Sequence, residues 1–417
     1  MPGARTILTA GALLLALLGA ACAGTSNQQV SGKVATSTAP TTSSTTTTTR
    51  APDCASTLPT SGQAAQLVMV MVADPSHAAD ALEAGTVSGY GLKGNQRSDV
   101  ADAIEATAGL SVLPISVAVD EEGGTVQRLR YSAGRLPSAE DMAEGTPAQA
   151  ANEVEAHARR MADMGVTMNF APVADVGSGA GLGSRSFGDD PTTVSEFAVA
   201  VGNANAAGGV TPVVKHWPGI GGAGVDPHNS LPTLDPVEEL RAVDMAPFRS
   251  AFEAGAPAVM VAHAEVPGLT ADGEPASLSR AAITDELRNS EGFGGVVMTD
   301  SLGMGAIVDD HTQAEAAELA ISAGADIALV SGTDVVNGVH ERLVEAITEG
   351  RIPAEQVEAS VRRVLSLRGI EGECFDAVSE YAAQARLEAD KAQREADLES
   401  RQESEGAALD GTATSSG

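Results

Sequence analysis

The feature that most constrains the fold is a regular alternation of short apolar runs with longer segments of helical spacing. Eight runs between residues 67 and 331 are short and apolar enough to be buried strands. They are Leu67–Val72, Ser88–Gly94, Pro114–Asp120, Thr167–Val173, Val210–Trp217, Ala258–Glu265, Gly295–Asp300 and Asp326–Ser331. Strands separated by helices are typical of a parallel sheet, because parallel strands need a long crossover connection.

The segments between these strands carry the signals of helices. Ala148–Gly165, Pro236–Ala254 and Thr312–Gly324 have apolar residues at helical spacing, and each has a glycine just before the next strand, where a C-cap is expected. Eight strand–helix units in about 315 residues predict a (β/α)8 barrel of the TIM type. An open, doubly wound sheet is the alternative, but the regular repeats and the lack of a dinucleotide-binding fingerprint favour the barrel.

The two ends of the chain have different compositions from the middle. In residues 1–22, Arg5 precedes an apolar run and small residues lead into Cys22, which predicts a lipoprotein signal peptide with Cys22 as the lipidation site. A plain, cleaved signal peptide is the alternative. Residues 23–53 are a Ser/Thr-rich linker, and residues 375–417 form an acidic tail expected to be a solvated helix that fades into disorder.

Charge and cysteine usage narrow the class of protein further. The formal net charge of −31 argues against nucleic acid as a partner and against electrostatic attachment to anionic lipid. Cys54 and Cys374 flank the predicted barrel, residues 54–374, and an exported protein can keep a disulfide between them. Two free buried thiols are the alternative, and nothing in the sequence indicates the oligomeric state.

Polar residues gather where the predicted strands end. They are Asp120 and Arg128 after the third strand, Asp175 and Arg185 after the fourth, Lys215 and His216 in the fifth, His263 in the sixth and Asp300 in the seventh. In a barrel these ends meet at one site. A glycine-rich loop after the fifth strand adds Asp226 and His228, and such a loop can place a histidine over a substrate while the carboxylate orients the ring. Carboxylate and acid/base groups together are the requirement of a glycosidase.

Four segments make the prediction more specific. VAVDEEGGTVQRLR, NFAPVADV with SRSFGDDP, KHWPGIGGAGVDPHNSLP and VVMTDSLGMGAI resemble, in order, the signature segments of bacterial β-N-acetylglucosaminidases in glycoside hydrolase family 3. The resemblance covers the whole barrel region. It implies a retaining, exo-acting hydrolase that needs no metal or cofactor and removes terminal β-linked N-acetylglucosamine, commonly from the peptidoglycan fragments called muropeptides.

The resemblance also assigns roles to individual residues. It implies that Asp300 is the nucleophile and that His228 is the acid/base, with Asp226 as its partner. The substrate-binding positions it implies are Asp120, Arg128, Arg185, Lys215 and His216. One departure lies within the dyad, where Pro227 replaces the usual serine and restricts the backbone.

Three other functions are open from the sequence. A phosphorylase would also use a histidine acid/base, since a second carboxylate would repel phosphate. A metal-dependent barrel hydrolase could use His216, His228, His263 and Asp300, and a sugar-binding lipoprotein could have kept the barrel without turnover. The intact Asp300, Asp226 and His228 favour an enzyme, and the leader predicts that it is tethered to the cell membrane on the extracytoplasmic side.

Overall fold

The computed structural model describes residues 54–111 and 113–370, and their strands form a parallel barrel. Eight strands are hydrogen-bonded in the order β10-β1-β2-β3-β6-β7-β8-β9. Their bounds are β1 Val68–Val72, β2 Gly89–Leu92, β3 Ser116–Val119, β6 Met168–Asn169, β7 Thr211–Trp217, β8 Ala258–Val261, β9 Val296–Thr299 and β10 Ala328–Ser331. A parallel bridge between Met298 and Ile327 joins β9 to the segment before β10 and closes the sheet. The predicted (β/α)8 barrel is confirmed, and each of the eight predicted strands contains one observed strand.

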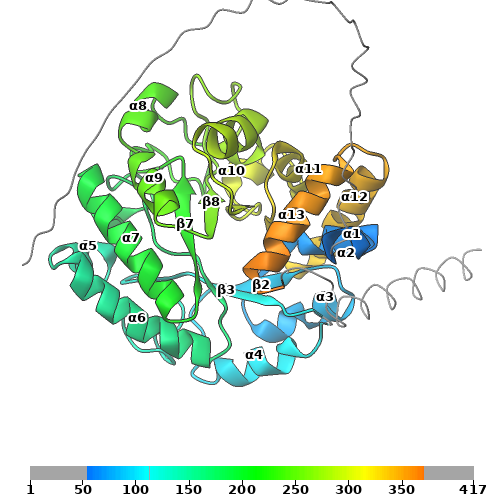
Figure 1. Ribbon diagram of the computed structural model, residues 1–417, viewed down its shortest axis with the longest axis horizontal. Helices are drawn as coiled ribbons and strands as arrows, with labels where there is room; N and C mark the ends of the chain where they lie inside the picture. The colour runs from blue at the N-terminus through cyan, green and yellow to red at the C-terminus, as the bar shows by residue number, and fades with distance from the viewer. Residues whose placement is uncertain (1–53, 112, 371–417) are drawn as a thin grey trace, which may run out of the picture. The chain divides into compact units, whose positions relative to one another are not determined.

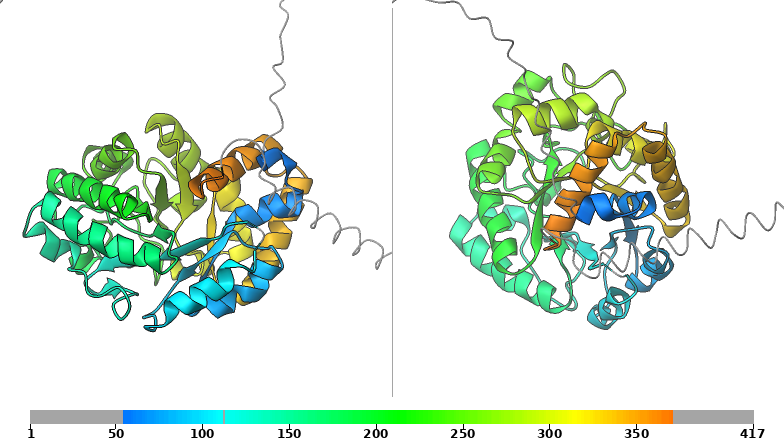
Figure 2. Two further views of the ribbon diagram at one scale, coloured as in Figure 1. Left: turned by 60° about the horizontal axis from the view of Figure 1, so that its bottom comes forward. Right: turned by 45° about the vertical axis from the view of Figure 1, so that its right-hand side comes forward.

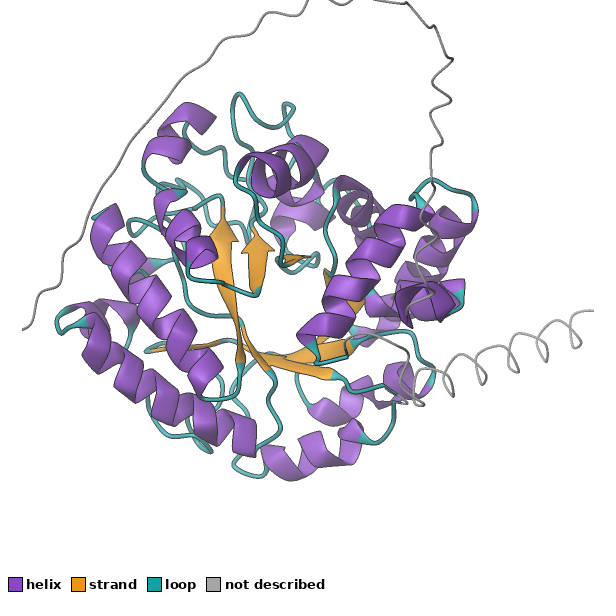
Figure 3. Cartoon of the chain, in the orientation of Figure 1, coloured by secondary structure: helices purple, strands orange, loops and turns teal. Residues whose placement is uncertain are grey.

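Helices surround the strands, as the ribbon views show (Figure 1, Figure 3). The α-helices are α1 Cys54–Thr57, α2 Thr60–Gln66, α3 Ala79–Glu83, α4 Val100–Ala108, α5 Ala139–Ala143, α6 Pro147–Asp163, α7 Pro191–Ala207, α8 Val237–Ala242, α9 Ala246–Glu253, α10 Gly305–Val308, α11 Gln313–Ala323, α12 Val336–Thr348 and α13 Ala354–Leu367. Short 3-10 turns are η1 Pro75–Ala78, η2 Gly183–Arg185, η3 Ala276–Leu278 and η5 Thr333–Val335, and η4 Ala281–Ser290 is a π-helix.

One predicted helix is divided in two. The segment expected to be helical over Pro236–Ala254 consists of α8 and α9, separated at Val243–Met245. Pro247 lies in the first turn of α9, where a proline is tolerated because its missing N–H has no partner to lose there. Further inside a helix the same ring would clash with the preceding turn, so the helix restarts before it. This break places Asp244 between the two helices.

The barrel interior is filled by side chains and is closed at one end by the last helix. The interior cluster consists of Met69, Met71, Ala118, Met168, Phe170, Val213, Ala258, Met260, Val296, Met298, Ile327, Leu329 and Val364. Val364 comes from α13, which also packs against α1 and α2, so the first and last described helices lie side by side (Figure 2). In the described part of the chain, no helix is both long enough and apolar enough to cross a membrane.

One short hairpin was not predicted. Directly after β3, the segments β4 Glu121–Gly123 and β5 Val126–Gln127 pair in an antiparallel manner. The segment reads as polar and glycine-rich in the sequence, which gave no strand signal. Extended backbone turns successive side chains to opposite sides, so this hairpin decides where each of three consecutive acidic residues points.

Candidate active site

A cleft of about 560 Å³ opens among the residues that follow the barrel strands. Its polar lining is Lys93, Asp120, Glu122, Thr125, Arg128, Arg185, Lys215, His216, His228, Asp300, Ser301 and Ser331, and its apolar lining includes Met71, Phe170, Met260, Met304 and Leu329. The size is that of a small-molecule site. The predicted nucleophile, the predicted acid/base and all five predicted substrate-binding residues line this cleft, and Asp226 is hydrogen-bonded to one of them.

Asp300 lies directly after β9. Its backbone N–H donates to the Val261 carbonyl at 2.9 Å, and the Ser301 N–H donates to its Oδ1 at 2.7 Å. Burial acts to raise the pKa of Asp300, but the neighbouring His216 and His263 rings and the Ser301 N–H outweigh it and hold that pKa below its ordinary value. The carboxyl is therefore ionised at neutral pH while it remains partly accessible from the cleft.

Lys215 lies inside β7 and joins two carboxylates of the neighbouring hairpin. Its Nζ is 2.7 Å from Asp120 Oδ1 and 2.6 Å from Glu122 Oε1. Burial lowers the pKa of Lys215, but the two carboxylates outweigh burial and raise that pKa above its ordinary value. The ammonium is thus a fixed cation at the wall of the cleft.

Arg185 clamps Glu122 with two parallel hydrogen bonds. Its Nε donates to Glu122 Oε2 at 2.7 Å and its Nη2 donates to Oε1 at 2.9 Å. Burial of Glu122 raises its pKa, but Lys215 and Arg185 together lower that pKa to about 2. The Nη1 of Arg185 donates to the Gly181 carbonyl at 3.0 Å, so protein acceptors already engage most of its N–H groups. A sugar can therefore receive few hydrogen bonds from Arg185.

His216, the neighbour of Lys215, is oriented by a fully buried aspartate. Asp175 Oδ2 is 2.7 Å from His216 Nδ1, and Asp175 Oδ1 accepts from the Ile220 N–H at 2.9 Å. A carboxylate can only accept, so Nδ1 carries the proton, and Nε2 accepts from Arg185 Nη2 at 3.4 Å at the side of the cleft. The peptide bond between Lys215 and His216 is cis.

The glycine-rich loop after β7 is fixed at its base. The Gly179 N–H donates to the Gly221 carbonyl at 2.8 Å. A Cβ added to Gly221 would lie 1.7 Å from the Val176 carbonyl oxygen, so only glycine lets the two backbones approach this closely. The loop therefore begins from a defined position beside Asp175.

Further along this loop, Asp226 and His228 form the predicted dyad. Asp226 Oδ1 accepts from the His228 backbone N–H at 2.9 Å and lies 2.7 Å from His228 Nδ1. Partial burial raises the pKa of Asp226, but the backbone N–H and the ring of His228 outweigh it and hold that pKa below its ordinary value. The His228 side chain is 64% exposed, so its Nε2 is free to meet a ligand that enters from solvent.

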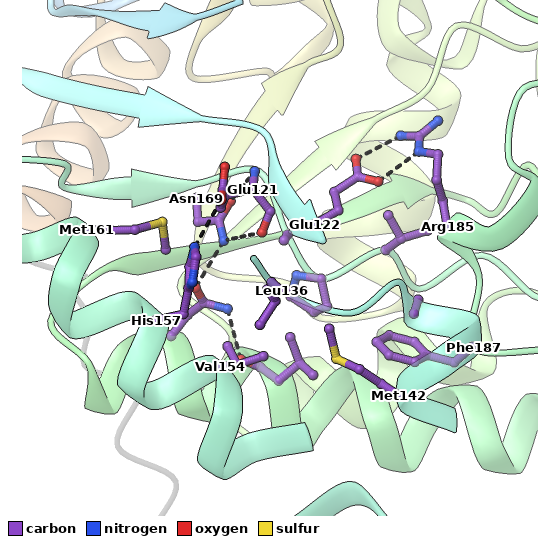
Figure 4. Close-up of a pocket in the computed structure, with 16 residues that line it drawn as sticks. Glu121, Glu122, Leu136, Met142, Val154, His157, Met161, Asn169, Arg185 and Phe187 are labelled. Atoms are coloured by element: carbon purple, nitrogen blue, oxygen red, sulfur yellow. Dashed lines mark hydrogen bonds and ion pairs between the residues drawn. The ribbon is translucent and has the colours of Figure 1, made fainter. Parts of the chain in front are cut away.

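Glu121 lies between the two acidic residues of the cleft in the sequence, but its side chain lies beside His157, whereas Glu122 meets Arg185 (Figure 4). Its Oε1 accepts from Gln127 Nε2 and His157 Nε2, both at 2.9 Å, and its Oε2 accepts from the backbone N–H groups of Arg128 and Leu129 at 2.7 and 2.9 Å. With four donors, this buried carboxylate is fully satisfied. It fixes the hairpin that carries the cleft residues on its other side.

Arg128 is held differently from the other cations of the cleft. Its Nη2 is 3.7 Å from Asp120 Oδ2, and its buried Nε has no hydrogen-bond partner among the described residues. An unpaired buried donor costs free energy unless a ligand or water accepts from it. Unlike Arg185 and Lys215, Arg128 therefore has an unpaired buried donor to offer to a ligand.

The structure brings together residues that the sequence predicted at the strand ends, and it adds Glu122 to them. Glu122 is absent from the predicted strand-end residues, and Asp175 is named among them without a role, although both belong to the quoted motifs. Glu122 pairs with Lys215 and Arg185, and Asp175 orients His216. The available signal was period-2 alternation from Asp120 to Glu122, which places both side chains on one side of an extended segment.

The described residues include no group of three or more His, Cys, Asp or Glu side chains arranged to hold a metal ion. Both ring nitrogens of His263 already have protein partners, Ser277 Oγ at 2.7 Å and the Ser301 carbonyl at 2.9 Å. The predicted lipidation site Cys22 and the predicted disulfide partner Cys374 lie outside the described residues.

The cleft at the strand ends of this parallel barrel holds an ionised aspartate and an exposed Asp–His dyad. These are the carboxylate and acid/base groups that a glycosidase requires, and comparison with known proteins agrees. Residues 60–367 match the family model described as the glycosyl hydrolase family 3 N terminal domain. The chain is 39% identical over 318 residues to Beta-hexosaminidase LpqI of Mycobacterium tuberculosis, covering 73% of this chain and 81% of that protein.

Solved structures agree with the sequence comparison. A glycosyl hydrolase of family 3 from Mycobacterium smegmatis superimposes with a TM-score of 0.72 at 38% identity, covering 76% of this chain and 98% of that one. A family 3 β-N-acetylglucosaminidase from Paenibacillus gives a TM-score of 0.71 at 29% identity, covering 78% and 68%. This chain belongs to glycoside hydrolase family 3, and it is a glycoside hydrolase.

Proposed function

We propose that the protein is a retaining exo-β-N-acetylglucosaminidase that acts on muropeptides. The observation that carries the proposal is the placement of one ionised carboxylate, Asp300, in the same cleft as the exposed ring of His228. The two groups can take the two roles that double displacement requires: one attacks carbon and the other moves a proton. The names of the relatives, β-hexosaminidase and β-N-acetylglucosaminidase, support the same reaction.

In the first step, an Asp300 carboxylate oxygen attacks the anomeric carbon as the glycosidic C–O bond breaks. The proton on His228 Nε2 passes to the departing oxygen, so the aglycone leaves as a neutral alcohol. In the second step, water attacks the glycosyl–Asp300 ester and His228 Nε2 takes its proton, which restores both groups. Asp226 stabilises the imidazolium form through its 2.7 Å contact with Nδ1.

The sugar would be held by the opposite wall of the cleft. Asp120 offers carboxylate oxygens to sugar hydroxyls, Arg128 offers its unpaired donors, and Lys215 keeps one ammonium hydrogen beyond its two carboxylate contacts. His216 presents Nε2. Arg185 contributes chiefly by fixing Glu122.

The test is release of a chromogenic aglycone from an N-acetyl-β-glucosaminide by the full chain, and release of free sugar from purified muropeptides. We expect turnover by the wild type and near-complete loss of turnover in Asp300→Ala. The matched control Asp310→Ala, which replaces an exposed aspartate, should keep the wild-type rate. A proton NMR time course should show the β-anomer of the released sugar first, as retention requires. First release of the α-anomer would exclude a glycosyl–Asp300 intermediate.

The same assay separates the alternative functions. Turnover that needs phosphate and yields a sugar phosphate would identify a phosphorylase. Tight binding of N-acetylglucosamine without turnover of any N-acetyl-β-glucosaminide would identify a sugar-binding protein.

We also propose that the protein is held at the extracytoplasmic face of the cell membrane through lipid on Cys22, with residues 23–53 as the linker to the barrel. The support is the sequence pattern around Cys22. Cys22→Ala should move the protein from the membrane fraction to the medium. A Cys54–Cys374 disulfide is proposed as well, and intact mass before and after reduction would show a difference of two hydrogens.

A further inference from the structure

His263 is a buried histidine at the end of β8 to which the proposed mechanism gives no role. It is 0% exposed, and it belongs to the polar residues that gather at the strand ends. The imidazole therefore exchanges no protons with solvent directly. A purely structural histidine would be expected to satisfy local groups remote from the chemistry, whereas the partners of His263 lead to Asp300.

The hydrogen bonds of His263 define its tautomer. The Ser301 carbonyl, 2.9 Å from Nε2, can only accept, so Nε2 carries the hydrogen. Nδ1 lies 2.7 Å from Ser277 Oγ, and a serine hydroxyl can donate to it. Burial lowers the pKa of His263, which favours the neutral ring. A neutral ring with Nε2–H is thus a fixed hydrogen-bond donor rather than an acid/base.

The residue that receives this hydrogen bond also contacts the nucleophile candidate. Ser301 accepts at its carbonyl from His263 and donates from its N–H to Asp300 Oδ1 at 2.7 Å. The Ser301 hydroxyl is 2.7 Å from Ser331 Oγ, so this serine is held at its carbonyl and its side chain. The carbonyl and the N–H of Ser301 belong to successive peptide units that meet at its Cα, so holding the carbonyl and the side chain fixes the Cα to which the N–H group is attached.

We propose that His263 is a positioning residue, which holds Ser301 at its carbonyl, helps to keep the Ser301 N–H aimed at Asp300 and so orients the attacking carboxylate. This inference rests on the proposed role of Asp300 as the nucleophile. It gives a role to each hydrogen bond in the series from Ser277 through His263 and Ser301 to Asp300. Because the Ser301 N–H favours the charged carboxylate, this series of hydrogen bonds also supports ionisation of Asp300.

The test compares two substitutions of His263 with a matched control. His263→Met introduces an apolar side chain of similar size and removes the Nε2–H donor. His263→Gln instead keeps an N–H that can reach the Ser301 carbonyl. His340 is the control, because its Nε2 also donates to a backbone carbonyl, that of Ser61 at 2.9 Å, but from α12. His340→Met therefore removes the same kind of hydrogen bond from a residue outside the cleft.

We expect His263→Met to lower kcat about ten- to hundredfold while KM changes less than about twofold, as loss of a transition-state interaction predicts. The acid limb of kcat/KM should move to higher pH. His216, His263, the Ser301 N–H and Lys215 favour the Asp300 anion, and the variant would lose the His263 ring and the aimed N–H. His263→Gln should recover most of kcat. His340→Met should lower the unfolding midpoint and leave both kinetic readouts unchanged.

Two measurements decide the proposal independently of turnover. In a crystal structure of His263→Met, the Ser301 N to Asp300 Oδ1 distance should exceed hydrogen-bonding range, and retention of 2.7 Å would overturn the inference. Nitrogen NMR of the wild type at pH 7 should show neutral His263 with Nε2–H. A charged ring or Nδ1–H at this pH would overturn the inference even if the variant does not fold. If wild type lacks glycosidase activity, the proposed function fails, and these two measurements still decide the role of His263.

Discussion

Replacing Glu122 by glutamine tests whether the charges that line the cleft contribute to the free energy of folding in addition to binding the substrate. The side chain is 4% exposed and lies between Lys215 and Arg185. Its pKa is lowered from 4.5 to about 2. At about 1.4 kcal/mol per unit of pKa, this difference corresponds to about 3 kcal/mol of folding free energy at pH 7. Removing one partner of a buried ion pair costs a similar amount, roughly 3–5 kcal/mol.

The sign of the effect gives the prediction its pH dependence. The folded-state pKa is depressed, so the stabilisation is fully present above pH 4.5 and is lost as pH falls toward 2. The gap in unfolding free energy between wild type and Glu122→Gln should be about 3 kcal/mol at pH 7 and about half of that at pH 3. Activity should fall with it, because Arg185 and Lys215 lose a shared anchor.

Urea unfolding of both proteins at the two pH values measures this gap, provided that the slope with urea is unchanged. Glu140→Gln is the matched control, since Glu140 is exposed on α5, and we expect it to change stability by less than about 0.5 kcal/mol. A gap below 1 kcal/mol at pH 7, or one of equal size at both pH values, would refute the argument from charge.

Three further predictions concern the loop after β7 and its surroundings. Burial, and after it the charges of Asp175 and Asp235, raises the pKa of Asp244 to about 7. Folded protein therefore binds a proton that the unfolded chain releases at lower pH, and the free energy of unfolding falls as pH rises from about 4 to about 7. Asp244→Asn should therefore be more stable than wild type in urea at pH 8 and equal to it at pH 4. Asp226→Asn should lower kcat about hundredfold, the usual contribution of an acid/base group, with stability unchanged; a rate within threefold of wild type would remove Asp226 from the mechanism. Gly221→Ala should destabilise the fold by about 1–3 kcal/mol, because its Cβ would collide with the Val176 carbonyl. Unchanged thermal stability would show that the backbone at the base of the loop can move apart to accept the Cβ.

The architecture and the general place of the site were predictable because they follow from local patterns. Each apolar run identifies a strand, each glycine before a strand ends a helix, and in a barrel the residues after the strands meet at one end. This logic predicts Asp300 and Lys215 in one cleft from the sequence alone. Local pattern failed between α8 and α9, where the apolar spacing continues but Pro247 restarts the helix.

The amino-acid sequence by itself determined the barrel, the order of its elements and the chemical types of residue that gather at the strand ends. Tertiary structure decided which of these residues touch. Arg185 and Glu122 are 63 positions apart, and Lys215 and Asp120 are 95 apart. No local periodicity reports such pairs, because their geometry depends on how neighbouring strands and loops pack. The same holds for the three consecutive acidic residues, of which the hairpin turns Asp120 and Glu122 toward the cleft and Glu121 toward His157, where four donors satisfy its buried charge.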